Sequence, residues 1–440
     1  MSLKKNISLN FASQLVNLFL GFGVSILISR MLGPAGRGDY ILVITSANFF
    51  VQFFTFGIES SISHYVAARK VAMERLLSTI IVCVLSIALL MTISIIALSL
   101  YSGTFLIPEN SFYYHLALIL LCLFMFLNNI YSSILSGARL FRQVIFINTG
   151  IQVLMLAVCI FFFIISPGNE LTAKILIMAM VGIYFLISVT YTIVYIRYIK
   201  TRPSWNFMTK PELKLFFSYS LIAFVCAVLQ FLNYRMDFWV INAWWGSEQL
   251  GIYSLAAGLS QLLWVLPQSI SMIMFPMSSY YGKPELLDIT NRLLRISIFI
   301  MLVIVIPLLL LSPFFIPLLF GKEFAGAVMY FQLFLIGIFP FILIKIFASV
   351  FAGIGKIIYN LWASFTGFLV GAIAYLTLIP LLGPVGGVIG SIASYLLSTI
   401  TGLYFYKKEF NSPITEMIFI KKTDLQFLKL QARTIMGLSK

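Results

Sequence analysis

The chain alternates long apolar segments with short polar ones. A membrane-spanning helix needs roughly 20 consecutive apolar residues, and twelve such segments can be read along the sequence. Their residues are continuously apolar instead of alternating, which predicts helices, because only helices and closed barrels satisfy their backbone groups in lipid. The expected spans are about 8–30, 40–65, 77–100, 112–136, 144–165, 172–196, 214–243, 250–278, 293–316, 326–351, 358–380 and 385–406.

Two glycine-containing turns echo each other. Residues 33–40 read Gly-Pro-Ala-Gly-Arg-Gly-Asp-Tyr, and residues 246–253 read Gly-Ser-Glu-Gln-Leu-Gly-Ile-Tyr. Both place a glycine five residues after the first and a tyrosine two further on. A second echo relates 132–139 to 348–355 at nearly the same offset. Two ordered echoes predict a duplicated half, and a duplicated half in a membrane protein suggests a transporter whose site lies between the repeats.

The longest hydrophilic connection predicts the domain boundaries. It covers about 197–213, and we expect a cytoplasmic linker over 201–213 between two six-helix lobes, 1–200 and 214–408. Six spans return the chain to its starting side, so the lobes are expected to be parallel repeats. Residues 409–440 are expected to form a cytoplasmic tail, either an interfacial helix or a disordered segment.

Composition supports the membrane assignment. Only 10% of residues are charged, against about 25% in a soluble domain. The net charge of +15 is distributed unevenly: with the N-terminus in the cytoplasm, 23 of the 29 lysines and arginines lie on the cytoplasmic side. This is the positive-inside pattern, and it places both termini in the cytoplasm. The charge therefore sets topology and contacts anionic lipid, and no nucleic-acid partner is expected.

The sequence shows no recognisable catalytic, metal-binding or phosphate-binding motif. The four cysteines have no metal-ligand spacing, and neither a Ser/His/Asp set nor a phosphate-binding glycine loop can be read. We therefore expect no enzyme, no metal and no cofactor. The turn after the first span has a plain structural interpretation, in which Pro34 starts a helix and the glycines allow a tight connection.

Two motifs carry a family resemblance. The sequence RMLGPAGRGDY follows the first span and FGIESSISHYVA ends the second. With twelve spans in two halves, the chain resembles the polysaccharide (Wzx-like) flippases of the multidrug/oligosaccharidyl-lipid/polysaccharide exporter superfamily. The resemblance implies an all-α, two-lobed bundle with a V-shaped central cavity. It further implies transfer of undecaprenyl-diphosphate-linked oligosaccharide from the inner to the outer leaflet of the bacterial cytoplasmic membrane. A monomer is expected, and a polysaccharide polymerase and other assembly proteins are the partners that fit this role.

Ionisable residues inside spans are candidate site residues, because each costs about 2.5–3.5 kcal/mol or more in the bilayer. They are Arg235, Asp237, Lys345, Glu59 and His64, with Arg30 at the outer end of the first span. Their different depths predict a ladder of charges across a cavity.

Cations suit an anionic ligand. We therefore expect Arg235 and Lys345, with Arg30, to contact the substrate's diphosphate or acidic sugars. The alternatives for Arg235 and Lys345 are a structural ion pair or snorkelling. Asn128 and Asn233 are further candidates for substrate contact, although Asn128 also suits a bond to a neighbouring helix.

Glu59 is the leading candidate for coupling transport to a proton or sodium ion, and a helix–helix hydrogen bond is the alternative for it. Asp237 and His64 are further coupling candidates, since a histidine titrates near neutral pH.

Three rival classes are less well matched. Drug/cation antiporters of the same superfamily commonly carry an acidic residue in the first span, and residues 8–29 have none. The loop at 68–75 lacks the Gly-x-x-x-Asp-Arg-x-Gly pattern of major facilitator transporters. A membrane polysaccharide polymerase or ligase usually needs a large outer loop, and all outer loops expected here are short.

Overall fold

The structure, a computed structural model, describes residues 3–69, 71–101, 105–108, 111–165, 173–426 and 429. Regular structure in these ranges is helical, with no strand. The expected loop around 102–111 and the tail from 427 onward lie mostly outside the described residues. The prediction of an all-α membrane protein is confirmed.

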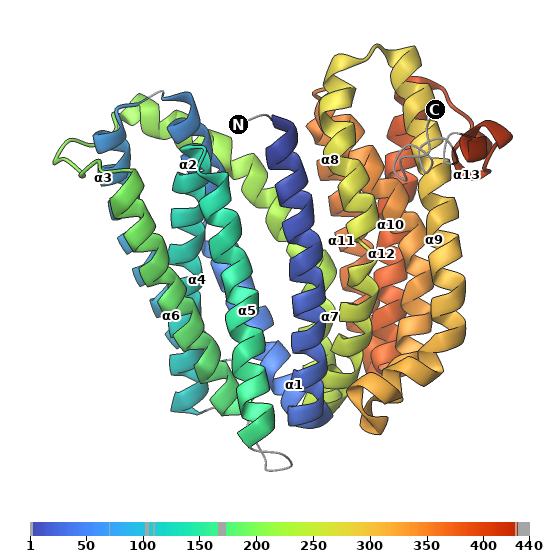
Figure 1. Cartoon of the computed structure of the whole chain (residues 1–440), viewed down its shortest axis with the longest axis horizontal. Coiled ribbons are helices and arrows are strands. Elements are labelled where there is room, and N and C mark those ends of the chain that lie inside the picture. Colours follow the sequence, from blue (N-terminus) through green and yellow to red (C-terminus); the bar gives the residue numbers. More distant parts are fainter. Residues whose placement is uncertain are drawn as a thin grey trace. The chain divides into compact units, whose positions relative to one another are not determined.

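The helices follow the predicted spans closely (Figure 1). They are α1 (Leu3–Phe54), α2 (Ile58–Ala68), α3 (Met73–Tyr101), α4 (Phe112–Gly137), α5 (Phe141–Ile165), α6 (Ala173–Tyr198), α7 (Lys210–Leu262), α8 (Val265–Tyr280), α9 (Lys283–Phe320), α10 (Ala327–Gly353), α11 (Ile357–Leu382), α12 (Pro384–Phe410) and α13 (Thr415–Ile418), with a 3₁₀ turn at Lys322–Phe324. Among the described residues, ten helices are long and apolar enough to cross a membrane.

Helix α1 folds back on itself at Gly33. The backbone there leaves the helical region (φ 62°, ψ −175°). Beyond it, Arg37 Nη1 donates hydrogen bonds to Ser25 O (3.2 Å) and Ser29 Oγ (2.8 Å). Twelve residues of straight helix rise about 18 Å, farther than an arginine reaches, so the two arms must lie side by side. One helix in the count of ten therefore contains two predicted spans.

Helix α7 repeats this geometry at Gly246 (φ 78°, ψ 175°). Past the break, the Tyr253 hydroxyl donates to the Asp237 carboxylate, and the rings of Phe238 and Tyr253 meet edge to face at 5.8 Å. A straight helix would separate residues 237 and 253 by about 24 Å. Two of these ten helices, α1 and α7, thus each contain two predicted spans. The total of twelve membrane crossings stays a prediction.

The chain divides into two compact units. Unit 1 comprises Met1–Ser254 with Leu319–Glu323, and unit 2 comprises Leu255–Leu318 with Phe324–Lys440. In unit 1, α4 packs against α1, α2 and α6; in unit 2, α10 packs against α8 and α12, and α11 packs along α12. The division falls inside α7, and the linker 201–213 belongs to unit 1. The lobe boundaries expected at 200 and 214 stay a prediction.

The second sequence echo corresponds to a duplicated packing contact. In unit 1, a Cβ on Gly137 of α4 would lie 2.8 Å from Ser63 O of α2. In unit 2, a Cβ on Gly353 of α10 would lie 2.7 Å from Phe275 O of α8. Each glycine thus lets one helix end approach the backbone of the next closely. The residue two positions later has positive φ in both places (Arg139 and Gly355).

The first part of the tail is fastened to unit 2. Arg295 of α9 holds Asp424 through two parallel hydrogen bonds of 2.6 and 3.0 Å, and its Nη1 donates to Glu416 O at 2.6 Å. Asn291 donates to Ser412 Oγ at 3.0 Å. The side chains of Arg295 and Asp424 are only 4% and 0% exposed. Up to residue 426 the tail is therefore held to α9 at Ser412, Glu416 and Asp424 and contains the short α13, while most of its other residues are exposed. The sequence had left an interfacial helix and a disordered segment as the two alternatives.

Candidate functional site

Three predicted site residues lie on one short stretch of α7 in unit 1. Asn233 and Asp237 are buried, and Arg235 is half-buried with its guanidinium 4.8 Å from the Phe238 ring centre. Asp237 accepts hydrogen bonds from the Tyr253 hydroxyl and from the Phe238 amide at 3.0 Å. The carboxylate therefore joins the two arms of α7.

Tyr253 was not among the predicted site residues, although its signal was present. It is the tyrosine of the repeated turn at 246–253, and the counterpart tyrosine, Tyr40, donates to Met180 Sδ at 2.7 Å. Both tyrosines are buried, so the repeat preserves a buried hydroxyl while the acceptor changes from a carboxylate to a thioether.

Arg30 contacts the end of another helix. Its Nε donates to Leu319 O at 2.7 Å, one of the last carbonyls of α9, which have no partner within the helix. A cation at this position also complements the negative end of the helix dipole. Arg30 as a whole is exposed.

Arg37 is a buried cation that falls between the predicted spans 8–30 and 40–65. It is 5% exposed and bonded to Ser25 and Ser29. The non-helical part of the turn is little more than Gly33 itself. The helix begins again at Pro34, and proline suits a first helical position. Arg37 is thereby carried into the packed second arm, where its Nε has no hydrogen-bond partner.

Glu59 and His64 both lie on the short helix α2. The half-buried Glu59 carboxylate lies near the Asn129 side chain of α4. The His64 ring packs edge to face on Tyr65 at 5.8 Å. The helix–helix hydrogen bond considered for Glu59 stays a prediction, with Asn129 as its candidate partner.

Asn128 is buried between α4 and α6. Its Nδ2 donates to Tyr184 O at 3.2 Å, and its Oδ1 accepts from Ser188 Oγ at 2.8 Å. The amide thus joins neighbouring helices, the alternative that the sequence left open, and its role as a substrate ligand stays a prediction.

Lys345 of α10 lies beside an aromatic cluster in unit 2. Its Nζ is 5.3 Å from the Phe341 ring centre. Phe341 stacks on Trp264 at 4.2 Å and 18°, and it meets Tyr395 at 5.6 Å. Ser271 of α8 donates to Lys345 O at 3.0 Å. Sequence reasoning missed Trp264, which lies in the turn between α7 and α8 where the span 250–278 was expected to be continuous.

The candidate site residues predicted to form a ladder of charges are divided between the two units. Unit 1 holds the 233–237 stretch, the Glu59–Asn129 pair and Arg30, and unit 2 holds Lys345 with its aromatic neighbours. Among the described residues, no group of histidine, cysteine and acidic side chains could hold a metal ion. The roles in substrate binding and coupling stay predictions.

The ten long apolar helices among the described residues indicate a multi-pass membrane protein. The fold agrees with solved structures. The chain is similar to the lipid II flippase MurJ (TM-score 0.73, 16% identity, covering 93% of this chain and 88% of that one). It is also similar to an inward-facing multidrug resistance MATE family transporter (0.69, 14%, 90% and 94%). A third similar structure is a MOP superfamily transporter from Pyrococcus furiosus (0.62, 16%, 93% and 96%). At these identities the likeness shows the fold alone.

Sequence comparison identifies the family. The family model described as "Polysaccharide biosynthesis protein" matches residues 3–281, more than half of the chain. The chain therefore belongs to the polysaccharide biosynthesis protein family. Comparison with curated proteins gave no match. The resemblance to the polysaccharide flippases of the exporter superfamily is confirmed.

Proposed function

We propose that the protein is a flippase that moves an undecaprenyl-diphosphate-linked oligosaccharide from the inner to the outer leaflet of the bacterial cytoplasmic membrane by alternating access. The observation that carries the proposal is the match of residues 3–281 to the polysaccharide biosynthesis family. The fold of a lipid II flippase supports a lipid-linked substrate. The reaction is transport without covalent chemistry.

In this proposal Arg235, Lys345 and Arg30 contact the anionic parts of the substrate. Each carries charge at or near membrane depth, where a cation is expensive. An aromatic face lies beside two of them, since Arg235 covers Phe238 and Lys345 covers Phe341. The aromatic neighbours keep the cations oriented at a modest energy of about 0.5–2 kcal/mol each. A diphosphate can compete with that interaction through charge-assisted hydrogen bonds.

The aromatic cluster beside Lys345 supports a carbohydrate substrate. The half-buried Trp264 stacks on the buried Phe341, which meets the buried Tyr395 edge to face, and the Lys345 ammonium supplies a charged donor beside Phe341. A sugar presents both an apolar ring face and hydroxyl groups, so it can pair with the partly exposed Trp264 ring and with the ammonium. Asn233 and Asn128 are further polar groups at membrane depth, though Asn128 already joins α4 to α6.

For coupling, Glu59 is the preferred residue. Its carboxylate is half-buried beside the neutral Asn129 amide, a group that can pair with either the protonated or the ionised carboxyl. Asp237 is buried and bonded on both oxygens, which suits anchoring the arms of α7. His64 remains a second candidate for proton movement.

The remaining features of the proposal concern the cellular setting. The cytoplasmic excess of lysine and arginine favours cytoplasmic termini. We propose that the protein acts as a monomer beside the polymerase and other assembly proteins that use its product.

A deletion strain tests the proposed function. Loss of the protein should leave lipid-linked repeat units on the inner leaflet and remove the surface glycan. The second candidate function is drug/cation antiport, which the shared fold with a multidrug MATE transporter favours. Normal surface glycan combined with sensitivity to cationic drugs would establish that alternative and exclude the flippase.

A further inference from the structure

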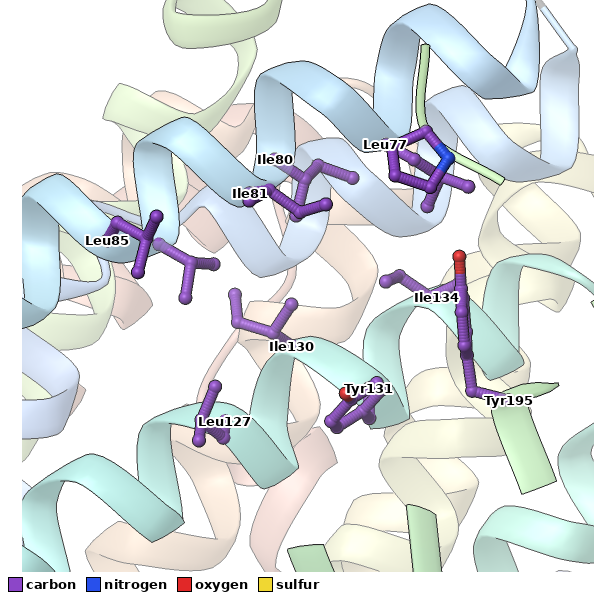
Figure 2. Close-up of a pocket in the computed structure, with 11 residues that line it drawn as sticks. Leu77, Ile80, Ile81, Leu85, Leu127, Ile130, Tyr131, Ile134 and Tyr195 are labelled. Carbon is purple, nitrogen blue, oxygen red and sulfur yellow. The ribbon is translucent and has the colours of Figure 1, made fainter. Parts of the chain in front are cut away.

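Unit 1 contains an apolar groove of about 220 Å³ on one face of its helices. Figure 2 shows α3 residues on one side facing α4 residues on the other, with Tyr195 at one flank. The groove is lined by Leu77, Ile80, Ile81, Val84, Leu85, Leu127, Ile130, Tyr131, Ile134, Tyr195 and Pro203. No charged side chain contributes to the lining, so its chemistry fits a hydrocarbon chain.

The groove has a closed inner wall and an open outer edge. Ile80 and Ile130 are each 4% exposed, whereas Ile81 and Leu85 are 44% and 66% exposed. The rest of this α3 face is also apolar and exposed, including Leu89 and Ile93. In a membrane-spanning helix such a face contacts lipid, so a lipid chain can enter the groove from the side.

The linker between α6 and α7 closes one end of the groove. The Tyr195 hydroxyl donates to Thr201 O at 3.3 Å, and the Ser78 hydroxyl of α3 donates to Ser204 O. The Met208 amide donates to Thr79 Oγ1 at 3.0 Å. These bonds hold both sides of Pro203 against α3 and α6. The linker is therefore a fixed rim of the groove.

The outer surface of this rim has the composition of a lipid head-group site. Trp205 is 94% exposed and Phe207 is 46% exposed. Lys200 and Arg202, both exposed, precede Pro203. Tryptophan is enriched at the membrane–water interface, and basic residues there attract anionic lipid.

We propose that this groove and its rim bind an anionic phospholipid of the surrounding bilayer. One acyl chain occupies the groove, and the phosphate lies beside Lys200 and Arg202. The charged residues lie only at the rim, and the groove lining is uncharged. This arrangement fits a lipid that stays in one leaflet, because its head group remains at the interface while its acyl chain lies in the groove. The site does not depend on the proposed transport function.

Native mass spectrometry of the detergent-solubilised full chain tests the site, with dioleoyl phosphatidylglycerol and dioleoyl phosphatidylcholine as probes. The wild type should bind phosphatidylglycerol about thirtyfold more tightly than phosphatidylcholine, since each of the two basic residues contributes about 1 kcal/mol near the surface. The double change Lys200→Gln with Arg202→Gln should remove that preference. Ile81→Trp, which fills the groove, should weaken binding of both lipids.

A matched variant separates groove filling from a general effect of a tryptophan. Ile93→Trp changes another exposed isoleucine on α3, 53% exposed against 44% for Ile81 and outside the groove, and should bind like the wild type. Equal losses in Ile81→Trp and Ile93→Trp, or a lipid preference that survives the double glutamine change, would overturn the proposal. Undecaprenyl diphosphate is the competing ligand with the same chemistry. If it displaces bound phosphatidylglycerol at equimolar concentration, the occupant is a polyprenyl lipid and the phospholipid assignment is wrong.

Discussion

Gly38 and Gly251 occupy equivalent positions in the two repeated turns, and each lies directly against the backbone of the other turn. A Cβ on Gly38 would overlap the carbonyl of Ser247, and a Cβ on Gly251 would overlap the carbonyl of Pro34. The two contacts are reciprocal, because Ser247 holds the same place in its turn as Pro34 does in the first. The repeat seen in the sequence thus forms a close two-way contact between α1 and α7 within unit 1.

This contact makes both glycines sensitive to the smallest substitution. We expect Gly38→Ala and Gly251→Ala to lower the free energy of unfolding by about 3 kcal/mol or more, because the helices must separate to admit a methyl group. Gly182→Ala on α6 is the control, since a Cβ there meets nothing within 4 Å. Thermal unfolding in detergent measures all three. Equal stability of Gly38→Ala and Gly182→Ala would contradict the packing described.

The second prediction concerns the cations assigned to the substrate. Arg235→Ala and Lys345→Ala should each reduce glycan export roughly tenfold or more, the cost of losing a hydrogen bond to a charged group. The amount of protein in the membrane should not change.

Two cations in similar aromatic settings serve as controls for these variants. Arg142 lies 5.4 Å from the Phe146 ring centre, and Lys174 lies 5.5 Å from that of Tyr114. Arg142→Ala and Lys174→Ala should export normally. If all four alanine variants lose export to the same degree, the effect is structural and the assignment of Arg235 and Lys345 is wrong.

The third prediction concerns coupling through Glu59. Glu59→Gln keeps a hydrogen-bonding group near Asn129 but cannot take up or release a proton. In proteoliposomes, an imposed pH gradient should accelerate translocation by the wild type and not by this variant. Glu74→Gln, at an exposed position in the first turn of α3, should respond like the wild type. A Glu59→Gln protein that still responds to the gradient would exclude this residue as the coupling site.

The fourth prediction concerns the fastened tail. Hydrogen bonds from Arg295 lower the pKa of the Asp424 carboxyl. Asp424→Asn should lower the free energy of unfolding by about 3 kcal/mol, because it leaves a buried arginine without its carboxylate. Asp288→Asn removes an exposed pair with Arg292 at 3.4 Å and should cost less than about 1 kcal/mol.

The pH dependence of this effect has a definite sign. A lowered pKa stabilises the folded state above the ordinary aspartate value of about 3.9, and the stabilisation is lost as pH falls through the lowered pKa. The stability difference between wild type and Asp424→Asn should therefore be constant from pH 7 to about pH 5 and shrink below about pH 4. A difference that disappears already near pH 6 would show that the ion pair is not the cause.

Hydropathy and spacing were enough to predict the helices and the repeat. Continuous apolar segments determine where helices form in lipid, and the paired glycines at 33 and 246 mark the breaks of α1 and α7 correctly. The spacing of the glycines could not show how few residues form the turn between the two arms of α1. For that reason the buried position of Arg37 beside Ser25 and Ser29 could not be predicted.

Contacts between residues that are distant in the sequence could not be predicted from the sequence alone. Arg295 and Asp424 are 129 residues apart, and neither stands in a motif, so the fastened tail has no local signal. The Trp264–Phe341 stack beside Lys345 likewise depends on how α8 packs against α10. Candidate charges could be recognised because charge is rare in lipid, whereas their partners required the fold.

Leaflet-resolved detection of the lipid-linked oligosaccharide tests the central claim most directly. In spheroplasts of a deletion strain, the fraction of lipid-linked repeat unit that a membrane-impermeant sugar-oxidising probe can reach should fall close to zero. Re-expression of the wild-type chain should restore it, and the Arg235→Ala, Lys345→Ala double variant should not. An accessible fraction that is the same with and without the protein would contradict the account.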